Sequence, residues 1–434
     1  MRMMRFLWFW LALGCGALSP VLLQAHEGPP HDDAPRPATQ PVGASVAELL
    51  ALARQMNPER AAAALEADAA IARAQGAGTL PDPQFQYLMD TITKNHNGLP
   101  GRLAVEKYEL QQTLPWWGKR ALQQGMAEAE SQEAQDKLAD VEAEIALRIK
   151  TAYADYHRVH LSMDQTAELR QIMRTLVQFA QFRYAQGMAT QLEATAAEAE
   201  RGALDVEQVR LGKERGRIRS RLNALVNRKP DAPVVEHPQL RPLPPPATLD
   251  YATLLQRAQA QNPALAMLEA RTQAAQQDHQ LSGKAWYPDV SVSLGLVQNR
   301  NAGEDNGFEA MVALNIPVQW EARRAKERET AAKLKAVQAQ QASEQLRIDA
   351  ALQETLLSLE EAREVAQLTQ NTLLPQARIA LQSALQGYQT GTTEAVAVLD
   401  AVQRLKRFQI DLLKAQFEAQ VRLAEIERLI GDDL

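Results

Sequence analysis

Residues 318–374 read VQWEARRAKERETAAKLKAVQAQQASEQLRIDAALQETLLSLEEAREVAQLTQNTLL, a run of 57 residues without glycine or proline between Pro317 and Pro375. Ala, Gln, Glu, Leu, Lys and Arg predominate, and these residue types lose little conformational freedom in a helix. An unbroken helix over this run would be roughly 85 Å long, whereas a compact domain of ordinary size is only about 30 Å across. We therefore predict an elongated helical body that ends at Pro375.

A second run without glycine or proline covers residues 126–186 in the first half of the chain. Segments of alternating polarity, which are typical of strands, lie ahead of both runs. They cover residues 85–90, 103–114, 290–296 and 308–316, and polar loops are predicted over 91–101 and 298–307. The pattern predicts a mainly α-helical chain with four strands.

The two halves repeat each other. Three groups of residues recur at offsets of 202 to 205 positions: Asn57–Pro58 with Asn262–Pro263, Pro115 with Pro317, and Tyr184–Gly187 with Tyr388–Gly391. A constant offset of this kind indicates a duplicated helix-helix-strand-strand-helix-helix unit. Within it, Asn-Pro suits the first residues of a helix, and each glycine suits a left-handed helix end.

The first 25 residues predict a secretory signal peptide. Arg2 and Arg5 precede an apolar run over residues 6–17, and Ala25 offers a small residue for cleavage. A short membrane anchor is the alternative, although the run is too short to span well. We then expect a Pro- and His-rich disordered tail (26–44), a first repeat (45–229), a Pro-rich linker (230–247) and a second repeat (248–434).

Cys15 is the only cysteine of the chain. The residues before it, Ala12 to Gly14, loosely resemble a lipoprotein cleavage box, so lipidation of Cys15 stays open. Cleavage after Ala25 would instead leave no cysteine for a disulfide, a metal-binding thiolate or a nucleophile.

Enzymatic chemistry finds no support in the sequence. We find neither a catalytic constellation nor a glycine-rich phosphate loop, and we expect no cofactor and no metal site. His157 and His160 lie three residues apart and could face the same way as metal ligands, but a packed or solvated pair is the alternative. The net charge is −6, or −8 without Arg2 and Arg5, which argues against a nucleic-acid partner.

Residues 201–228 are rich in basic side chains: Arg210, Lys213, Arg215, Arg217, Arg219 and Arg221. One interpretation is an electrostatic surface. The other is a helix face that pairs with acids on neighbouring helices.

The four predicted strands suit a membrane. They have about the length that spans a bilayer when tilted, and their faces alternate in polarity. Four strands cannot close a barrel, and an open edge in lipid would leave backbone amides unpaired. We therefore expect three copies to form a twelve-stranded barrel that long coiled helices continue as a tube. The alternative is a soluble pair of hairpins attached to a coiled coil.

The duplicated unit, the proline-bounded strand-to-helix turns and the Tyr-x-x-Gly hairpins resemble the TolC family of outer-membrane efflux channels. The resemblance covers about residues 45–432, and the turn Pro115–Arg120 is similar to that of the heavy-metal branch, the CzcC- and CusC-like channels. It implies a homotrimer, with its barrel in the lipid of a Gram-negative outer membrane and its tube in the periplasm.

The same resemblance implies partners and a role. A periplasmic adaptor (membrane fusion protein) and an inner-membrane pump of the proton-driven RND type would supply the substrate, heavy-metal cations. Efflux of drugs or organic solutes, type I secretion, or a periplasmic coiled-coil scaffold without a pore are the alternatives.

The resemblance also implies functional residues in the two hairpins. The adaptor would dock at Gly187, Met188, Thr190, Gly391, Thr392 and Thr393. The periplasmic gate would use Tyr388 and Asp400, expected near one level on opposed helices. The family's Arg position holds Thr393 and its first Asp position holds Ala397, so Glu394 is the nearest substitute. A ring of Asp400 carboxylates would favour cations, unless Asp400 pairs with a basic residue on a neighbouring helix.

Overall fold

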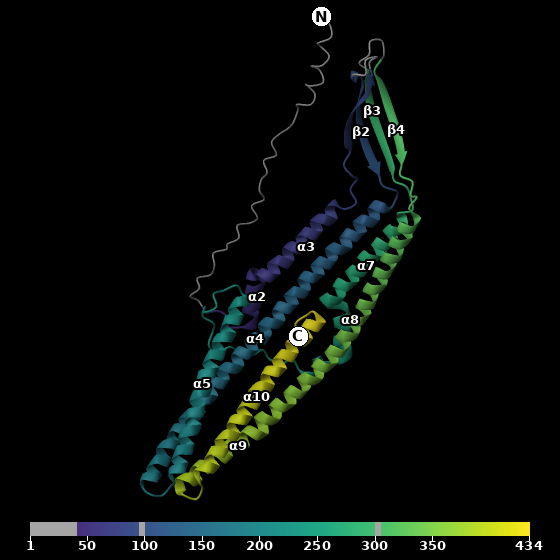
Figure 1. Ribbon diagram of the computed structural model, residues 1–434. Helices are drawn as coiled ribbons and strands as arrows, with labels where there is room; N and C mark the ends of the chain where they lie inside the picture. The colour runs from purple at the N-terminus through teal and green to yellow at the C-terminus, as the bar shows by residue number, and fades with distance from the viewer. Residues whose placement is uncertain (1–40, 95–99, 300–304) are drawn as a thin grey trace. The chain divides into compact units, whose positions relative to one another are not determined.

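The structure, a computed structural model, describes residues 41–94, 100–299 and 305–434. Most of these residues are helical, and four strands form one antiparallel sheet, as predicted (Figure 1). Among the described residues, no helix is both long enough and apolar enough to cross a membrane. The predicted signal peptide and Cys15 lie outside the described residues.

The sheet joins the two halves of the chain. Its strands are β1 (Gln84–Lys94), β2 (Pro100–Leu114), β3 (Val290–Asn299) and β4 (Gly307–Leu314), in the order β1-β2-β3-β4. β2 of the first half pairs with β3 of the second from Val105 opposite Asn299 to Leu114 opposite Val290. β1 and β4 are the two edges.

The strand ends differ from the prediction at several positions. β3 and β4 extend into the predicted polar loop over 298–307, since β3 ends at Asn299 and β4 begins at Gly307. β1 and β2 extend into the predicted polar loop over 91–101, of which 95–99 lie outside the described residues. β4 ends at Leu314, whereas we predicted a strand to Ile316. The Asn315 N–H still bonds to the Asp289 carbonyl at 3.1 Å, but Pro317 has no N–H with which to continue the ladder.

The first half contributes α2 (Val46–Met56), α3 (Pro58–Gly76), α4 (Lys119–Ala185) and α5 (Gln191–Leu225). The Ser45 hydroxyl caps α2 by accepting the Glu48 N–H at 3.2 Å. α4 has 67 residues and begins before the predicted run, because Gly125 remains helical. The long helix is therefore confirmed and extended.

The second half contributes η1 (Pro246–Thr248), α6 (Tyr251–Gln261), α7 (Pro263–Lys284), α8 (Trp320–Leu368), the π-helical turn η2 (Thr369–Leu373), α9 (Leu374–Thr390) and α10 (Ala395–Ile430). The predicted helix end at Pro375 is wrong. A proline ring clashes with the carbonyl four residues earlier in a regular helix. In η2 the Leu374 N–H instead bonds to the Thr369 carbonyl, and the widened turn lets the helix pass Pro375.

Equivalent asparagines make equivalent contacts in the two halves. The Asn57 side chain caps α3 and donates to the Leu225 carbonyl at 2.8 Å. The Asn262 side chain caps α7 and donates to the Leu429 carbonyl at 2.9 Å. Each asparagine thus ties the start of one helix to the end of another helix of the same half.

Three apolar clusters form the core. One belongs mainly to α2, α4 and α5, a second to α6, α8 and α10, and a third joins the hairpin ends of both halves. α4 packs against α3, α5, α7 and α10, whereas α8 packs against α6, α7 and α10.

The ends of the predicted tail and linker meet in the first cluster. Val42 forms a parallel bridge with Val234, and both side chains are buried. Residues 41–44, which we assigned to the disordered tail, are therefore ordered.

Candidate functional site

In the hairpin between α4 and α5, helix α4 is followed by a glycine with a left-handed backbone conformation. Gly187 has φ of 69°, and the Met188 N–H closes back on the Arg183 carbonyl at 2.9 Å. Thr190 and Glu193 then form both bonds of a capping box that starts α5. The predicted helix end and cap are confirmed.

The hairpin between α9 and α10 repeats this arrangement. Gly391 has φ of 79°, and the Thr392 N–H bonds to the Gly387 carbonyl at 2.9 Å. A Cβ on Gly387 would lie 2.1 Å from the Thr393 hydroxyl, so this turn also requires glycine at position 387. Sequence reasoning missed Gly387, which lies inside a helix of otherwise ordinary composition.

Arg183 joins the two hairpins. Its guanidinium donates to the Met188 carbonyl at 3.1 Å in its own hairpin and to the Tyr388 carbonyl at 2.9 Å in the other. It also lies over the Tyr388 ring, 4.8 Å from the centroid. Sequence reasoning missed this contact because Arg183 and Tyr388 are 205 residues apart.

Tyr388 is buried at the centre of this junction. Its ring is 1% exposed and meets Phe179 edge-on, with 5.6 Å between centroids. Its hydroxyl has no hydrogen bond of ordinary geometry to the described residues. Burial, together with the nearby Glu193 carboxylate, raises the pKa of Tyr388. The side chain is therefore a neutral, packed element of the junction.

Asp400 and Glu394 are exposed on the α10 side. The Asp400 carboxylate accepts a 2.6 Å bond from Arg404, one turn later on the same helix, and its side chain remains 63% exposed. Glu394 precedes α10 without a side-chain cap. Tyr388 lies on α9 and Asp400 on α10, the two helices of this hairpin, and the first is buried whereas the second is exposed.

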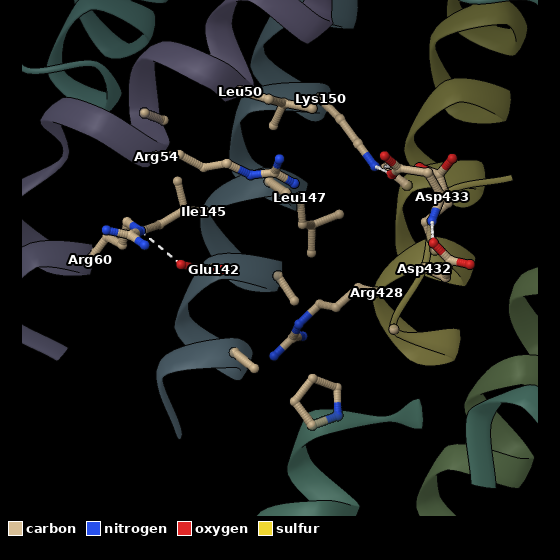
Figure 2. Close-up of a pocket in the computed structure, with 18 residues that line it drawn as sticks. Leu50, Arg54, Arg60, Glu142, Ile145, Leu147, Lys150, Arg428, Asp432 and Asp433 are labelled. Carbon is tan, nitrogen blue, oxygen red and sulfur yellow. Dashed lines mark hydrogen bonds and ion pairs between the residues drawn. The ribbon is translucent and has the colours of Figure 1, made fainter. Parts of the chain in front are cut away.

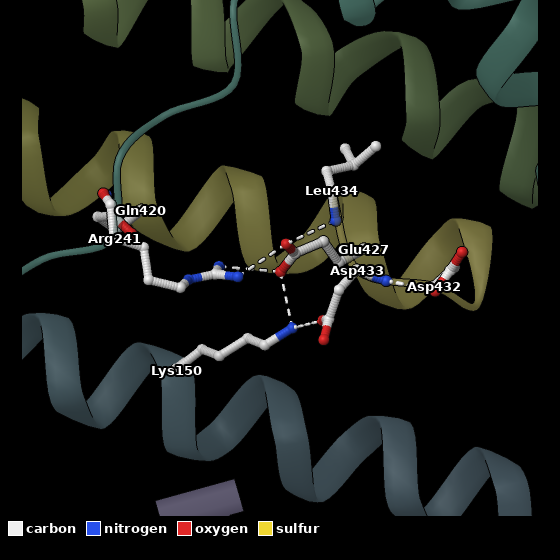
Figure 3. Close-up of polar contacts among 7 residues, drawn as sticks. All are labelled: Lys150, Arg241, Gln420, Glu427, Asp432, Asp433 and Leu434. Atoms are coloured by element: carbon white, nitrogen blue, oxygen red, sulfur yellow. Dashed lines mark hydrogen bonds and ion pairs between the residues drawn. The ribbon is translucent and has the colours of Figure 1, made fainter. Parts of the chain in front are cut away.

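A second polar cluster joins α4, the linker and α10 (Figure 3). Lys150 of α4 donates to Glu427 of α10 at 2.8 Å and also pairs with Asp433. Arg241 of the linker holds the same Glu427 through two bonds of 2.8 and 2.9 Å. Burial opposes ionisation of Asp433, but Lys150 and Arg241 outweigh it and lower the pKa of that carboxyl.

A cavity of about 250 Å³ adjoins this cluster between α2, α4 and α10 (Figure 2). Arg60 pairs with Glu142 at 2.7 Å, and Arg428 reaches Glu144 at 3.1 Å. Both signs of charge are represented about equally, so the cavity favours neither an anion nor a cation.

Of the predicted histidine pair, His160 is packed against aromatic rings. His160 meets Tyr156 at 4.5 Å and His237 at 5.9 Å between ring centroids. Burial lowers the pKa of both His157 and His160. No group of three or more potential ligands that could hold a metal ion occurs among the described residues.

Comparison with known proteins agrees with this architecture. Residues 254–432 match the family model described as outer membrane efflux protein. A search of curated proteins found no match. The family model describes an efflux protein, in agreement with the prediction that the chain is not an enzyme.

Solved structures share the fold at low sequence identity. The outer membrane protein VceC from Vibrio cholerae is 20% identical, with 90% of this chain and 97% of that chain covered and a TM-score of 0.79. The outer-membrane channel OprN is 18% identical, with 89% of each chain covered and a TM-score of 0.77. CusC is 17% identical, with 91% of this chain and 94% of that chain covered and a TM-score of 0.76. The chain therefore has the TolC-like fold of these outer-membrane channel structures, and its residues 254–432 match the outer membrane efflux protein family model.

Proposed function

We propose that three copies of this chain form the outer-membrane channel of a tripartite efflux system. The channel would receive its substrate from an inner-membrane pump and a periplasmic adaptor and release it outside the cell. The observation that carries the proposal is the sheet, which exposes apolar side chains and has two edges, β1 and β4, without a further strand among the described residues.

The faces of the sheet suit lipid better than water. Phe308 is 90% exposed, Val312 68% and Leu294 66%. Exposed apolar surface of this extent marks an interaction site or a membrane contact. The unpaired edges β1 and β4 would be costly in hydrocarbon, and pairing β4 of one copy with β1 of the next removes that cost. Three copies would supply twelve strands.

The two hairpins support a docking role. Met188 and Phe182 are each 57% exposed, Leu192 is 76% exposed and Val396 is 63% exposed. These side chains lie within five residues of the proposed docking residues Gly187, Thr190, Gly391, Thr392 and Thr393. We propose that the adaptor contacts this apolar surface.

Heavy-metal cations are the substrate class that we propose, with a proton-driven pump of the RND type as the source. The support is the resemblance of the turn at Pro115–Arg120, together with the exposed carboxylates of Asp400 and Glu394 near the hairpins. Export of drugs, organic solutes or proteins uses the same fold and would leave the rest of the proposal unchanged.

Fractionation of membranes tests the proposal. The chain, of 48.0 kDa, should be extracted by detergent from the outer membrane as a heat-labile trimer that forms channels in planar bilayers. A stable, folded monomer at micromolar concentration in detergent would contradict it.

Asp400→Asn should lower the cation selectivity of single channels, because the proposed ring at the entrance loses its charge. Conductance should persist. Asp411→Asn on the same helix is the matched control and should have a smaller effect, since Asp411 lies three turns farther from the hairpin. Unchanged selectivity in Asp400→Asn would show that pairing with Arg404 already neutralises the carboxylate.

A further inference from the structure

α5 carries four exposed cations on one face. Arg210, Lys213, Arg217 and Arg221 follow one another at intervals of three or four residues, opposite the face that α5 buries. Of these four residues, only Arg210 has an ion pair to a described residue, a 3.8 Å contact with Glu207. We name these four residues the basic face.

α8 and α9 carry an apolar stripe that no described residue covers. Leu346, Leu357 and Leu368 of α8 and Ile379 of α9 are 70%, 56%, 62% and 64% exposed. They are spaced 11 residues apart, and this interval returns to nearly the same side of a helix after three turns. A long helix with such a stripe is suited to pack along a partner.

Three acids share the face of this stripe between two of its leucines. Glu360, Glu361 and Glu364 are exposed, and none has an ion pair to a described residue. Together with Leu357 and Leu368 they form what we name the leucine-glutamate face. Carboxylates without partners beside exposed leucines suit a basic surface with apolar side chains of its own.

The two faces lie at the same level of the helical body. Arg158 of α4 binds Glu214 of α5, which places the middle of the basic face beside residue 158. Buried Ile145, Ile149 and Tyr156 of α4 correspond to Ile348, Leu352 and Leu359 of α8 at an offset of 203 residues, so Glu361 corresponds to position 158. The Lys150–Glu427 ion pair holds the two halves side by side at this level.

The two faces cannot meet within one chain. In the described residues α5 packs on α4 and touches α10, whereas α8 packs on α6, α7 and α10 (Figure 1). The helices α4 and α10 thus separate α5 from α8, and each face points away from its own chain. We propose that the basic face of one copy packs against the leucine-glutamate face of a second copy.

Charge and apolar pattern both fit this pairing. Lys213 and Arg217 would meet Glu361 and Glu364, while exposed Val206 and Val209 would meet Leu368. The contact joins two different surfaces, so it repeats around a ring and closes when three copies complete the turn. This inference rests on the proposed trimeric channel and identifies the helical contact that assembles it.

Charge reversal tests the contact. Lys213→Glu/Arg217→Glu and Glu361→Lys/Glu364→Lys should each raise the trimer dissociation constant about tenfold or more, measured by light scattering in detergent. The quadruple variant should recover most of the loss, because its pairs are restored with opposite sign. Arg404→Glu/Arg407→Glu on α10 makes the same charge change outside both faces and should leave assembly unchanged.

Cysteine cross-linking gives an independent readout in chains that fold normally. With Cys15 replaced by serine, co-expressed Lys213→Cys and Glu364→Cys chains should form a disulfide between copies, whereas either chain alone should not. A trimer that neither responds to charge reversal nor cross-links would overturn the inference and leave the proposed channel standing. A monomeric wild-type chain would overturn both.

Discussion

At the scale of single residues, Arg183 shows how one side chain can replace a missing partner. The resemblance places an arginine at position 393, where this chain has threonine. Arg183 approaches Tyr388 from the other hairpin instead, through a carbonyl bond and the aromatic face. The two hairpins are thus held by a planar, five-donor group whose geometry lysine cannot reproduce.

We expect Arg183→Lys to loosen the junction of the hairpins by about 1–2 kcal/mol, because the lysine keeps its charge but loses the forked pair of hydrogen bonds. Hydrogen exchange at residues 386–394 should accelerate, and the closed channel should leak more ions. Arg174→Lys, at an exposed position about two and a half turns earlier on α4, is the matched control. Equal rates of hydrogen exchange at residues 386–394 in both variants would show that the Arg183 contacts do not stabilise the junction of the hairpins.

His160 should make the stability of the chain depend on pH. Burial lowers the pKa of His160 below its ordinary value of 6.5, with nearby Arg215 and His237 acting in the same direction and Asp164 and Glu236 opposing them. His160 therefore binds a proton at higher pH in the unfolded chain than in the folded chain. The free energy of unfolding accordingly decreases as the pH falls through 6.5.

The midpoint of thermal unfolding should accordingly drop between pH 7.5 and pH 5.5. His157→Gln/His160→Gln should flatten this dependence, because burial lowers the pKa of both histidines. If the midpoint of the double variant still depends on pH in the same way, groups other than these two histidines cause the dependence.

At the scale of elements, both hairpin turns depend on a glycine with positive φ. Gly391 has φ of 79° with open space around its Cβ position, so a substitution there meets backbone strain without a clash. Gly391→Val should cost about 1 kcal/mol or more, whereas Gly391→Asn should cost less, because asparagine tolerates the left-handed region.

Adaptor binding should weaken in Gly391→Val and persist in Gly391→Asn, while the trimer survives in both. Binding of purified adaptor to each variant is the measurement. If Gly391→Val binds the adaptor as the wild type does, this hairpin is not the docking surface.

At the scale of the whole molecule, a buried ion cluster ties the two halves to the linker. Lys150 and Glu427 are 277 residues apart, and their side chains are 5% and 2% exposed. Lys150→Met removes one of the cations that pair with the buried Glu427 carboxylate, so the free energy of unfolding should fall by about 3–5 kcal/mol.

The exposed ion pair of Lys137 with Glu66 supplies the control, since both side chains are more than half exposed. Lys137→Met should cost less than about 1 kcal/mol. Unfolding should be followed by circular dichroism at one protein concentration, because assembly contributes to the apparent stability. Similar losses in the two variants would show that burial does not distinguish the pairs.

Local patterns in the sequence determined the strands, the long helices, the duplication and the glycine turns. Alternation over 290–296, the asparagine-proline caps and the left-handed glycines at 187 and 391 each depend on the conformational preferences of a few neighbouring residues. Such preferences act before any helix packs, so they can be recognised in the chain alone. The exact strand ends escaped prediction because they depend on bonds such as that of Asn315 to Asp289.

Only the tertiary structure decided which distant side chains meet. Tyr388 and Asp400 are close in sequence, yet packing buries the first against Arg183 and leaves the second to pair with Arg404. The passage of the helix through Pro375 likewise required the π-helical turn. Contacts between Lys150, Arg241 and Glu427 have no local signature, because their geometry depends on how three separate segments pack together.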